Sequence, residues 1–284
     1  MQMISVIICS RKKVINEVFI TNIENTIGYI YELIIIDNSE NKYSIFEAYN
    51  LGIEKSTGDY WCFIHDDILF HTVGWGEVVR SVFEQDNKIG LIGIAGAKLK
   101  TKMPSAWWDC PEQFKIINII QHFKFGKVKH LQQGWNENNI EEVVVVDGVF
   151  MAARRIDKMR FSDSLKGFHN YDLNLSFGYK KQGYRIVVNK EILIEHFSKG
   201  VLNASWCQSA VKIHDLYSEI LPFQLNNHSE NIRGLEFKNG SKFITFSLGH
   251  IDRKVIMRYW VRLIGIKTIS KFHLKFLRIL FNKC

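Results

Sequence analysis

Two adjacent carboxylates at the end of an apolar run are the side chains best placed to do chemistry. Residues 60–64 are rich in aromatic and β-branched side chains, which predicts a buried strand, and this strand continues into His65-Asp66-Asp67. Neighbouring carboxylates repel each other, and their burial is costly unless a cation or hydrogen-bond donors face them. Open α/β sheets bind ligands at the carboxyl ends of their strands. A divalent cation that holds a diphosphate would account for the pair, and a solvated turn with two acids is the alternative.

The elements that must position this pair alternate between strands and helices. Strands are predicted at residues 4–8, 32–36, 60–64 and 90–95, and helices at residues 14–26, 44–55 and 76–85. Nearly continuous apolar strands separated by helices indicate a parallel sheet that is covered on both faces. The predicted class is therefore α/β, with a mostly parallel central sheet flanked by helices.

The middle of the chain is less regular. Residues 98–142 hold Trp107, Trp108 and Trp135 among polar and basic side chains, which predicts a long, partly ordered insertion. Long loops of this kind are often functional lids. The tryptophans could stack on an acceptor ring or anchor the loop in the core. A buried strand at residues 143–146 then ends in Asp147.

The composition limits the possible classes of protein. The chain has 284 residues, 46% of them hydrophobic and 23% charged, which excludes a disordered chain. Its net charge of +8 suggests anionic partners. Five scattered cysteines without a CxxC pair indicate neither a zinc knuckle nor a disulfide framework, and they fit a reducing compartment. No apolar run of about 18 residues predicts a spanning helix, and the first residues lack the pattern of a signal peptide.

Residues 252–284 form a basic tail in which Asp252 is the sole acid. Basic residues recur at steps of four, as in Lys254, Arg258 and Arg262, and Gly265 is expected to interrupt the helix. A basic amphipathic helix with bulky apolar residues suits an anionic membrane surface. Packing on the chain's own domain or on a partner subunit is the alternative.

An ordered series of segments over residues 3–200 resembles the glycosyltransferase family 2 superfamily, which has the A-type nucleotide-diphospho-sugar transferase fold. The segments are Ser5-Val6-Ile7-Ile8, Ile35-Ile36-Asp37-Asn38-Ser39, Asn50-Leu51-Gly52-Ile53, Thr57-Gly58-Asp59-Tyr60 and Phe63-Ile64-His65-Asp66-Asp67. Each segment is weak by itself, but their order and spacing together are specific. The resemblance implies an inverting, metal-dependent transfer of a hexose-type sugar from a nucleotide-diphospho-sugar, in particular a UDP-sugar, to a glycan or lipid-linked hydroxyl.

The resemblance also implies roles for individual residues on the donor side. Asp37 would read the donor base, although it could instead cap the next turn, and Asp66 would reach the ribose hydroxyls. Asp67 would bind manganese or magnesium, and His196 at the end of an apolar strand would be a further metal ligand. A plain hydrogen-bonded role is the alternative for His196. Two further donor-side positions are implied by their matching segments, Asn50 and Asp147, and a turn carboxylate is the alternative for Asp147.

Inverting transfer needs a general base that deprotonates the acceptor hydroxyl. In the family this base is an Asp shortly before a helix, and Asp172 matches that place. The sequence departs from the commoner Glu-Asp pair because Tyr171 precedes Asp172, and Asp163 is the competing choice. No Gln-x-x-Arg-Trp motif follows, so we expect transfer of a single sugar.

Other classes of protein are less consistent with the residues. A sugar nucleotidyltransferase or a Rossmann dehydrogenase needs a glycine-rich loop after the first strand, and residues 9–13 contain no glycine. The nucleotidyltransferase and a non-catalytic, membrane-surface relative that binds nucleotide sugars are kept as alternatives. Nucleic-acid binding is not expected, because much of the excess charge lies in the tail.

The predicted organisation has three parts. Residues 1–205 form the catalytic domain, residues 206–251 connect it to the tail, and residues 252–284 form the basic helical tail. We expect a cytoplasmic protein, peripheral on the inner face of the cytoplasmic membrane through this tail, and a homo-oligomer is possible. Assembly of a bacterial surface polysaccharide is the setting that the family resemblance implies.

Overall fold

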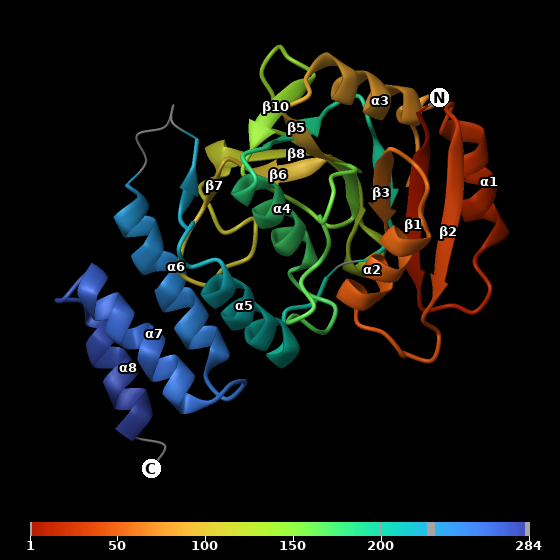
Figure 1. The fold of residues 1–284 in the computed structure, drawn as a ribbon. Coiled ribbons are helices and arrows are strands. Elements are labelled where there is room, and N and C mark those ends of the chain that lie inside the picture. The colour runs from red at the N-terminus through yellow and green to blue at the C-terminus, as the bar shows by residue number, and fades with distance from the viewer. Residues whose placement is uncertain (1, 199, 226–230, 282–284) are drawn as a thin grey trace.

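A computed structural model describes residues 2–198, 200–225 and 231–281, which fold into a mixed α/β structure (Figure 1). The helices are α1 Glu17–Thr26, α2 Ile45–Lys55, α3 Trp75–Gln85, α4 Tyr171–Lys181, α5 Ala204–Leu216, α6 Ile232–Ser247, α7 Arg253–Ile266 and α8 Lys271–Phe281. The strands of the large sheet are β1 Ile4–Ser10, β2 Tyr31–Asp37, β3 Tyr60–Ile64, β5 Ile89–Gly93, β10 Ile140–Val143, β12 Phe150–Arg154 and β13 Arg185–Asn189. The remaining strands are β4 Ile68–Phe70, β6 Ala95–Ala97, β7 Leu99–Lys100, β8 Lys115–His122, β9 Val128–Gln133, β11 Val145–Val146, β14 Ile194–His196 and β15 Phe223–Gln224.

The large sheet has seven strands in the order β10-β13-β5-β12-β3-β1-β2. β1 pairs in parallel with both β2 and β3, and β13 pairs in parallel with β5, as the alternation of strands and helices predicts. β12 is inserted antiparallel between β3 and β5, and the edge strand β10 is antiparallel to β13, so the sheet is mixed. The predicted α/β class is confirmed.

The second sheet has the order β11-β6-β8-β14-β4, and β9 pairs with β8. It contains the β8–β9 hairpin, which lies at the centre of the predicted insertion. The strand predicted at residues 143–146 is divided between the two sheets. Val143 ends β10 in the large sheet, whereas Val145 begins β11 in the second. The chain therefore changes sheets at Val144.

The core lies on both faces of the large sheet, which explains the continuous apolar sequence of β3. Trp61 and Phe63 belong to one buried cluster, and Tyr60, Cys62 and Ile64 belong to the other. Successive side chains of a strand point to opposite faces, so both faces of β3 must be apolar. The buried strand β3 thereby fixes the position of the turn that follows it.

The C-terminal helices pack together around a third hydrophobic core. Figure 1 shows α6, α7 and α8 together at one end of the molecule, opposite β1, β2 and α1. Their shared core includes Phe243 of α6, Tyr259 of α7 and Phe276 of α8. The tail is two helices rather than one, and the break lies at residues 267–270, while Gly265 lies within α7. Within the described residues, no helix combines the length and apolar content needed to span a bilayer.

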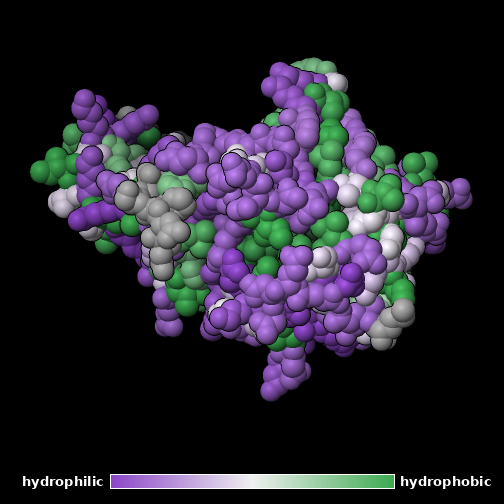
Figure 2. All heavy atoms as spheres, turned by 90° about the horizontal axis from the view of Figure 1, so that it is seen from above, coloured by the Kyte–Doolittle hydropathy of each residue, from purple (hydrophilic) through white to green (hydrophobic). Residues whose placement is uncertain are grey.

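One half of the predicted basic stripe is used in packing. Arg258 and Arg262 of α7 both form ion pairs with Asp215 of α5, and their guanidinium groups lie over the ring of Tyr259. Lys271, Lys275 and Arg278 of α8 are also exposed. Figure 2 shows hydrophobic and hydrophilic side chains intermixed at the end of the molecule where α7 and α8 lie.

The close approach of α2 to β1 requires a glycine. A Cβ at Gly52 would lie 2.3 Å from Cγ2 of the buried Ile7, whereas a Cβ at Gly265 of α7 would meet nothing within 4 Å.

We predict that Gly52→Ala lowers the free energy of unfolding by about 1–3 kcal/mol, because the stiff side chain of Ile7 cannot move aside. Gly265→Ala should raise it by up to about 1 kcal/mol, because alanine favours the helix. Urea unfolding of both variants tests this, and equal effects would contradict it.

Candidate active site at the ends of β1, β2 and β3

Three parallel strands end at the same edge of the large sheet and bring the predicted residues together. Ser10 at the end of β1 lies opposite Asp37 at the end of β2, and Ile64 at the end of β3 lies opposite Ile8. The Ser10 hydroxyl donates a hydrogen bond of 2.6 Å to Asp66 Oδ2. The acidic pair therefore lies at the carboxyl edge of the sheet, where α/β folds bind ligands.

The two adjacent acids point in different directions, because side chains alternate along an extended segment. Asp66 turns toward β1. Asp67 Oδ1 lies 3.6 Å from His65 Nδ1 and 3.6 Å from His196 Nε2. One group of histidine, cysteine, aspartate or glutamate side chains among the described residues is close enough to hold a metal ion. It consists of His65, Asp67 and His196, whose ligand atoms lie within 4.8 Å of one another.

Strand pairing brings His196 to the acidic segment. β4 begins directly after Asp67, and it pairs antiparallel with β14 so that His196 lies opposite Ile68. The backbone N–H of Phe197 donates a hydrogen bond of 3.1 Å to the carbonyl oxygen of Asp67. The predicted ligand pair Asp67 and His196 is thus placed together by the second sheet.

Gln121 of β8 fixes the orientation of the His196 ring. Its side-chain nitrogen donates to the carbonyl oxygens of His122, His196 and Ser198, so its Oε1 must accept from His196 Nδ1 at 3.0 Å. With Nδ1 engaged by Gln121, Nε2 is the ring nitrogen left to face Asp67. Such outer partners commonly fix the tautomer of metal-binding histidines.

Tyr171 at the start of α4 orients the His65 ring in the same way. The Tyr171 hydroxyl lies 2.5 Å from His65 Nε2 and 3.3 Å from the carbonyl oxygen of Gly148. With Nε2 engaged by the Tyr171 hydroxyl, His65 Nδ1 is the ring nitrogen left to face Asp67. Burial keeps the pKa of Tyr171 well above its ordinary value, so the hydroxyl retains its proton. A Cβ at Gly148 would lie 2.5 Å from this hydroxyl, so glycine is required there.

His65 is the functional candidate that the sequence reading missed. Residues i and i+2 of an extended segment lie on the same side of the chain, so a ligand at Asp67 predicts a neighbour at position 65. Tyr171, noted in the sequence as a departure from the commoner pair, supports this additional histidine. The donor set of two imidazoles and one carboxylate fits Mn²⁺ better than Mg²⁺.

The electrostatics hold Asp67 in its anionic form. Burial disfavours its charge, but hydrogen bonds from His196, His65 and Ser198 outweigh burial and keep the pKa of Asp67 well below its ordinary range. A permanent negative charge between two imidazoles is suited to a cation.

Asp172 lies in the first turn of α4 and has the opposite environment. Burial, followed by the charge of the neighbouring Asp147, raises the pKa of Asp172 from 3.8 to about 7. Asp147 itself accepts hydrogen bonds from Trp107 Nε1 at 2.6 Å and from the backbone N–H of Val149 at 2.8 Å. A carboxyl group with a pKa near neutrality can accept a proton from a bound hydroxyl and release it again.

The remaining predicted residues occupy different settings. Asp37 is exposed, and the backbone N–H of Ser39 donates to it and lowers its pKa. Asn50 is buried and exchanges two hydrogen bonds of 2.9 Å with the backbone of Phe161, so its side chain supports that segment. The competing base Asp163 is exposed and pairs with Arg160. The structure therefore groups Asp66, Asp67 and His196 at one place and Asp147 with Asp172 at another.

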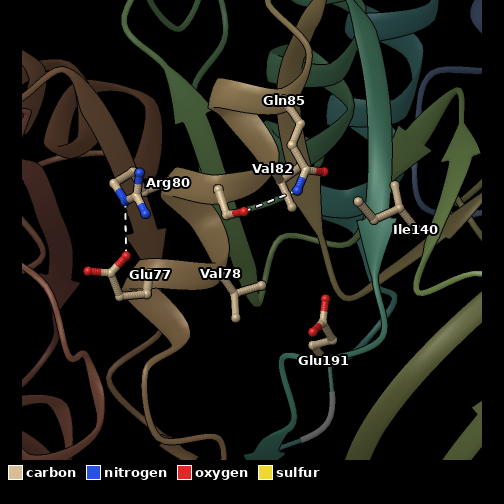
Figure 3. A pocket seen from close by; sticks show the side chains of 8 residues that line it. Glu77, Val78, Arg80, Val82, Gln85, Ile140 and Glu191 are labelled. Atoms are coloured by element: carbon tan, nitrogen blue, oxygen red, sulfur yellow. Dashed lines mark hydrogen bonds and ion pairs between the residues drawn. The ribbon is translucent and has the colours of Figure 1, made fainter.

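A pocket on the outer surface of α3 has a volume of about 280 Å³ and contains none of these residues (Figure 3). Its polar side chains are already partnered, since Arg80 pairs with Glu77 and Gln85 donates to Ser81. It supplies no acid, base or ligand group comparable with those at the strand ends.

Comparison with known proteins identifies the family of the chain. The sequence profile of a family described as "Glycosyltransferase like family" matches residues 5–220, and the chain belongs to this family. No curated protein sequence matches the chain. The predicted resemblance to the glycosyltransferase family 2 superfamily is thereby confirmed.

Solved glycosyltransferase structures share the fold. The structure of GalNAc-T7 with UDP, GalNAc and Mn²⁺ superposes with a TM-score of 0.53 at 10% identity, covering 92% of this chain and 54% of that one. The structure of S. aureus TarS with UDP-GlcNAc gives 0.52 at 8% identity, covering 93% of this chain and 80% of that one. The chain thus spans about half of the GalNAc-T7 chain. At these identities the comparisons establish the A-type fold.

The ligand group can be tested with the metal alone. We predict that Asp67→Asn lowers Mn²⁺ affinity by about 100-fold or more, because the anionic ligand is lost while its shape is kept. His65→Ala and His196→Ala should each lower it by about 10-fold to 100-fold. His71→Ala is the matched control, since His71 pairs with Glu195 and lies outside the group. Titration followed by electron paramagnetic resonance measures free Mn²⁺, and unchanged binding by His65→Ala would remove His65 from the site.

The pKa of Asp172 predicts how stability depends on pH. The folded chain keeps a proton on Asp172 that the unfolded chain releases above its ordinary pKa of 3.8. The folded protein therefore loses stability relative to the unfolded chain as the pH rises from 3.8 to about 7, and Asp172 causes no further change above that pH. Asp172→Asn should become more stable than the wild type over this window, by about 2–4 kcal/mol at pH 8.

Urea unfolding of both proteins between pH 4 and pH 8 measures the difference. The exposed Asp163→Asn serves as the control, and its effect on stability should stay within about 0.5 kcal/mol. If the difference in the free energy of unfolding between wild type and Asp172→Asn stayed constant across this pH range, folding would not raise the pKa of Asp172.

Proposed function

We propose that the protein is a metal-dependent, inverting glycosyltransferase that moves a hexose-type sugar from a UDP-sugar to a hydroxyl of a glycan or lipid-linked acceptor. The observation that carries the proposal is the group His65, Asp67 and His196 at the strand ends of a chain that belongs to a glycosyltransferase-like family. The Mn²⁺ and UDP of the GalNAc-T7 structure and the UDP-GlcNAc of the TarS structure support the choice of metal and donor class.

The donor side consists of the acidic segment and its neighbours. Asp67, His65 and His196 would hold Mn²⁺ or Mg²⁺, which when bound offsets the charge on a departing diphosphate. Asp66, whose Oδ2 accepts from the Ser10 hydroxyl, would accept from the ribose hydroxyls. Asp37 would accept from the base of the nucleotide, and Asp147 would contact the donor sugar.

Asn50 has an indirect role in this scheme. The nitrogen of its side-chain amide donates to the carbonyl oxygen of Phe161, and the amide oxygen accepts from the N–H of Phe161. The same nitrogen also donates to Asp163 Oδ1 at 3.3 Å. It would therefore contribute to donor binding by fixing the segment that precedes α4.

The acceptor side depends on Asp172 as the general base. Its pKa of about 7 allows it to be unprotonated near neutral pH while remaining a strong enough base to take the proton of an acceptor hydroxyl. One carboxylate base that activates a nucleophile for direct displacement gives inversion at the sugar carbon. The alternative base Asp163 is exposed and already paired with Arg160, so the geometry favours Asp172.

The setting that we propose is the inner face of the cytoplasmic membrane of a bacterium, in the assembly of a surface polysaccharide, with a homo-oligomer as a further possibility. Support comes from the outward face of α8, where Lys271, Lys275 and Arg278 surround Leu274, whose side chain is 63% exposed. None of the three cations forms an ion pair with a described carboxylate. Ile269, between α7 and α8, is 89% exposed. Cations around exposed apolar side chains suit an anionic bilayer surface.

A screen of UDP-sugars with Mn²⁺ tests the transferase proposal. We predict that one of them raises the melting temperature and that wild-type protein releases UDP from it. Asp172→Asn should lower transfer by about 100-fold or more while UDP affinity persists, because the base is lost and the donor site is intact. Near-normal turnover would assign the base elsewhere. Binding without turnover would favour the non-catalytic relative, and release of pyrophosphate would favour the nucleotidyltransferase.

The membrane proposal predicts binding to vesicles that contain phosphatidylserine, with partial release at high salt because exposed charges are screened. Replacing Lys271, Lys275 and Arg278 by glutamate should abolish co-sedimentation, since each cation near the surface contributes about 1 kcal/mol. A variant with glutamate at the exposed Lys55, Lys88 and Lys181 has the same change in net charge and should still bind. Equal loss in both variants would mean that overall charge, and not the α8 face, is responsible.

A further inference from the structure

The loop of residues 101–110 connects the proposed active site to the C-terminal helices. It follows β7 and carries Trp107, whose Nε1 donates the 2.6 Å hydrogen bond to Asp147. Asp147 in turn lies close enough to Asp172 for its charge to act on that carboxyl group. The loop is thus bonded through Trp107 to Asp147, which lies beside the proposed base Asp172.

Helix α6 holds the loop from the opposite side. The Glu236 carboxylate accepts the backbone N–H groups of Lys102 and Met103 at 2.5 and 2.7 Å. The side-chain nitrogen of Asn239 donates to Thr101 Oγ1 at 3.0 Å and to the carbonyl oxygen of Asp109 at 2.8 Å. Glu236 and Asn239 are 8% and 3% exposed, so these bonds are formed away from water. α6 therefore bonds to both the beginning and the end of the loop.

Two further contacts leave the loop little freedom. Lys100 Nζ, buried beneath it, donates to the carbonyl oxygen of Ser105 at 3.0 Å and lies 2.7 Å from His214 Nε2 of α5. A Cβ at Gly240 of α6 would lie 2.5 Å from Cε of Met103, so the loop and the helix are in close contact. The segment lacks regular structure, but buried polar bonds fix it, and such bonds are costly to break.

The two tryptophans of the loop differ in exposure. The ring of Trp107 is 8% exposed and packs edge-to-face against Trp108, with centroids 5.5 Å apart at 88°. Trp108 is 39% exposed. Trp107 is therefore an anchor, and Trp108 presents a flat apolar surface whose orientation is set before any ligand binds. Rigid aromatic surfaces beside a few polar groups are typical of sites that bind ringed ligands.

We infer that the loop of residues 101–110 forms the acceptor-side wall of the site, with Trp108 as the surface on which a sugar ring of the acceptor packs. Glu236 and Asn239 of α6 are positioning residues that act through this loop. The inference rests on the proposed glycosyl transfer and adds an acceptor class, a molecule with a sugar ring next to the reacting hydroxyl. It also gives a role in the reaction to α6, which lies outside the family match at residues 5–220.

Trp108→Ala in the full chain tests the packing surface. The probes are p-nitrophenyl glycosides as acceptors, with the UDP-sugar that wild-type protein turns over as donor and Mn²⁺ present. We expect the acceptor KM to rise about tenfold, the scale of one lost aromatic contact, while the Kd of UDP stays as in wild type. Trp108→Phe should recover most of the loss. The control is Phe125→Ala, which removes a fully exposed ring at the tip of the β8–β9 hairpin and should leave the KM unchanged.

Asn239→Ala tests the positioning role of α6 against a matched change in the same helix. Asn231 caps α6 by accepting from the N–H of Gly234, and among the described residues it forms no hydrogen bond with the loop, so Asn231→Ala weakens the helix alone. Both variants should lower the melting temperature. Asn239→Ala should also raise the acceptor KM at least threefold, whereas Asn231→Ala should not. Equal acceptor KM values in the two variants would reduce α6 to a structural support.

The outcomes separate this inference from the proposed function. If wild-type protein turns over no UDP-sugar, the transferase proposal fails and the inference fails with it. If wild-type protein transfers sugar and Trp108→Ala keeps an acceptor KM within twofold of wild type, the inference is overturned and the transferase proposal stands.

Discussion

The antiparallel pairing of β4 with β14 is the interaction on which the site depends. β4 begins directly after Asp67 and β14 ends in His196, so a short ladder of backbone hydrogen bonds brings the two side chains together. β8 pairs with β14 in parallel and supplies Gln121, which sets the tautomer of His196. The second sheet is therefore more than a covering layer, because its strands bring a ligand from late in the chain to the end of β3. Loss of this pairing would leave Asp67 with His65 alone as a partner in the ligand group.

The carboxylates of the site are held in two different states by their surroundings. Hydrogen bonds from imidazole groups keep Asp67 anionic, whereas burial beside Asp147 makes ionisation of Asp172 unfavourable. Groups whose environments separate their pKa values in this way can take different roles in one reaction. Tyr171 connects the two regions, since it begins α4 next to Asp172 and its hydroxyl contacts His65. The Tyr171 hydroxyl thus links the first turn of α4 to the proposed ligand group.

The C-terminal helices use in packing much of what the tail sequence offers. Trp260, Phe272 and Phe276 lie in or against the core of the helical unit, and Arg258 and Arg262 neutralise Asp215. The outward face of α8 retains exposed cations around Leu274, so packing leaves that face available for the membrane contact that we propose. On its inner side, α6 bonds the loop that carries Trp107 and Trp108. The helical unit is thereby connected to the loop that we propose as the acceptor-side wall.

The sequence by itself determined those features that depend on local pattern. Apolar runs predicted the strands, and the acids at their ends predicted the location of the site, because parallel strands end at one edge of a sheet. The resemblance predicted Asp67, His196 and Asp172, and the structure places the first two in contact. Only the tertiary structure decided that His65 joins them, that Asn50 faces Phe161, and that residues 143–146 divide between two sheets. These features depend on contacts between segments far apart in the chain. A local pattern carries no information on which distant strand or helix will supply the partner.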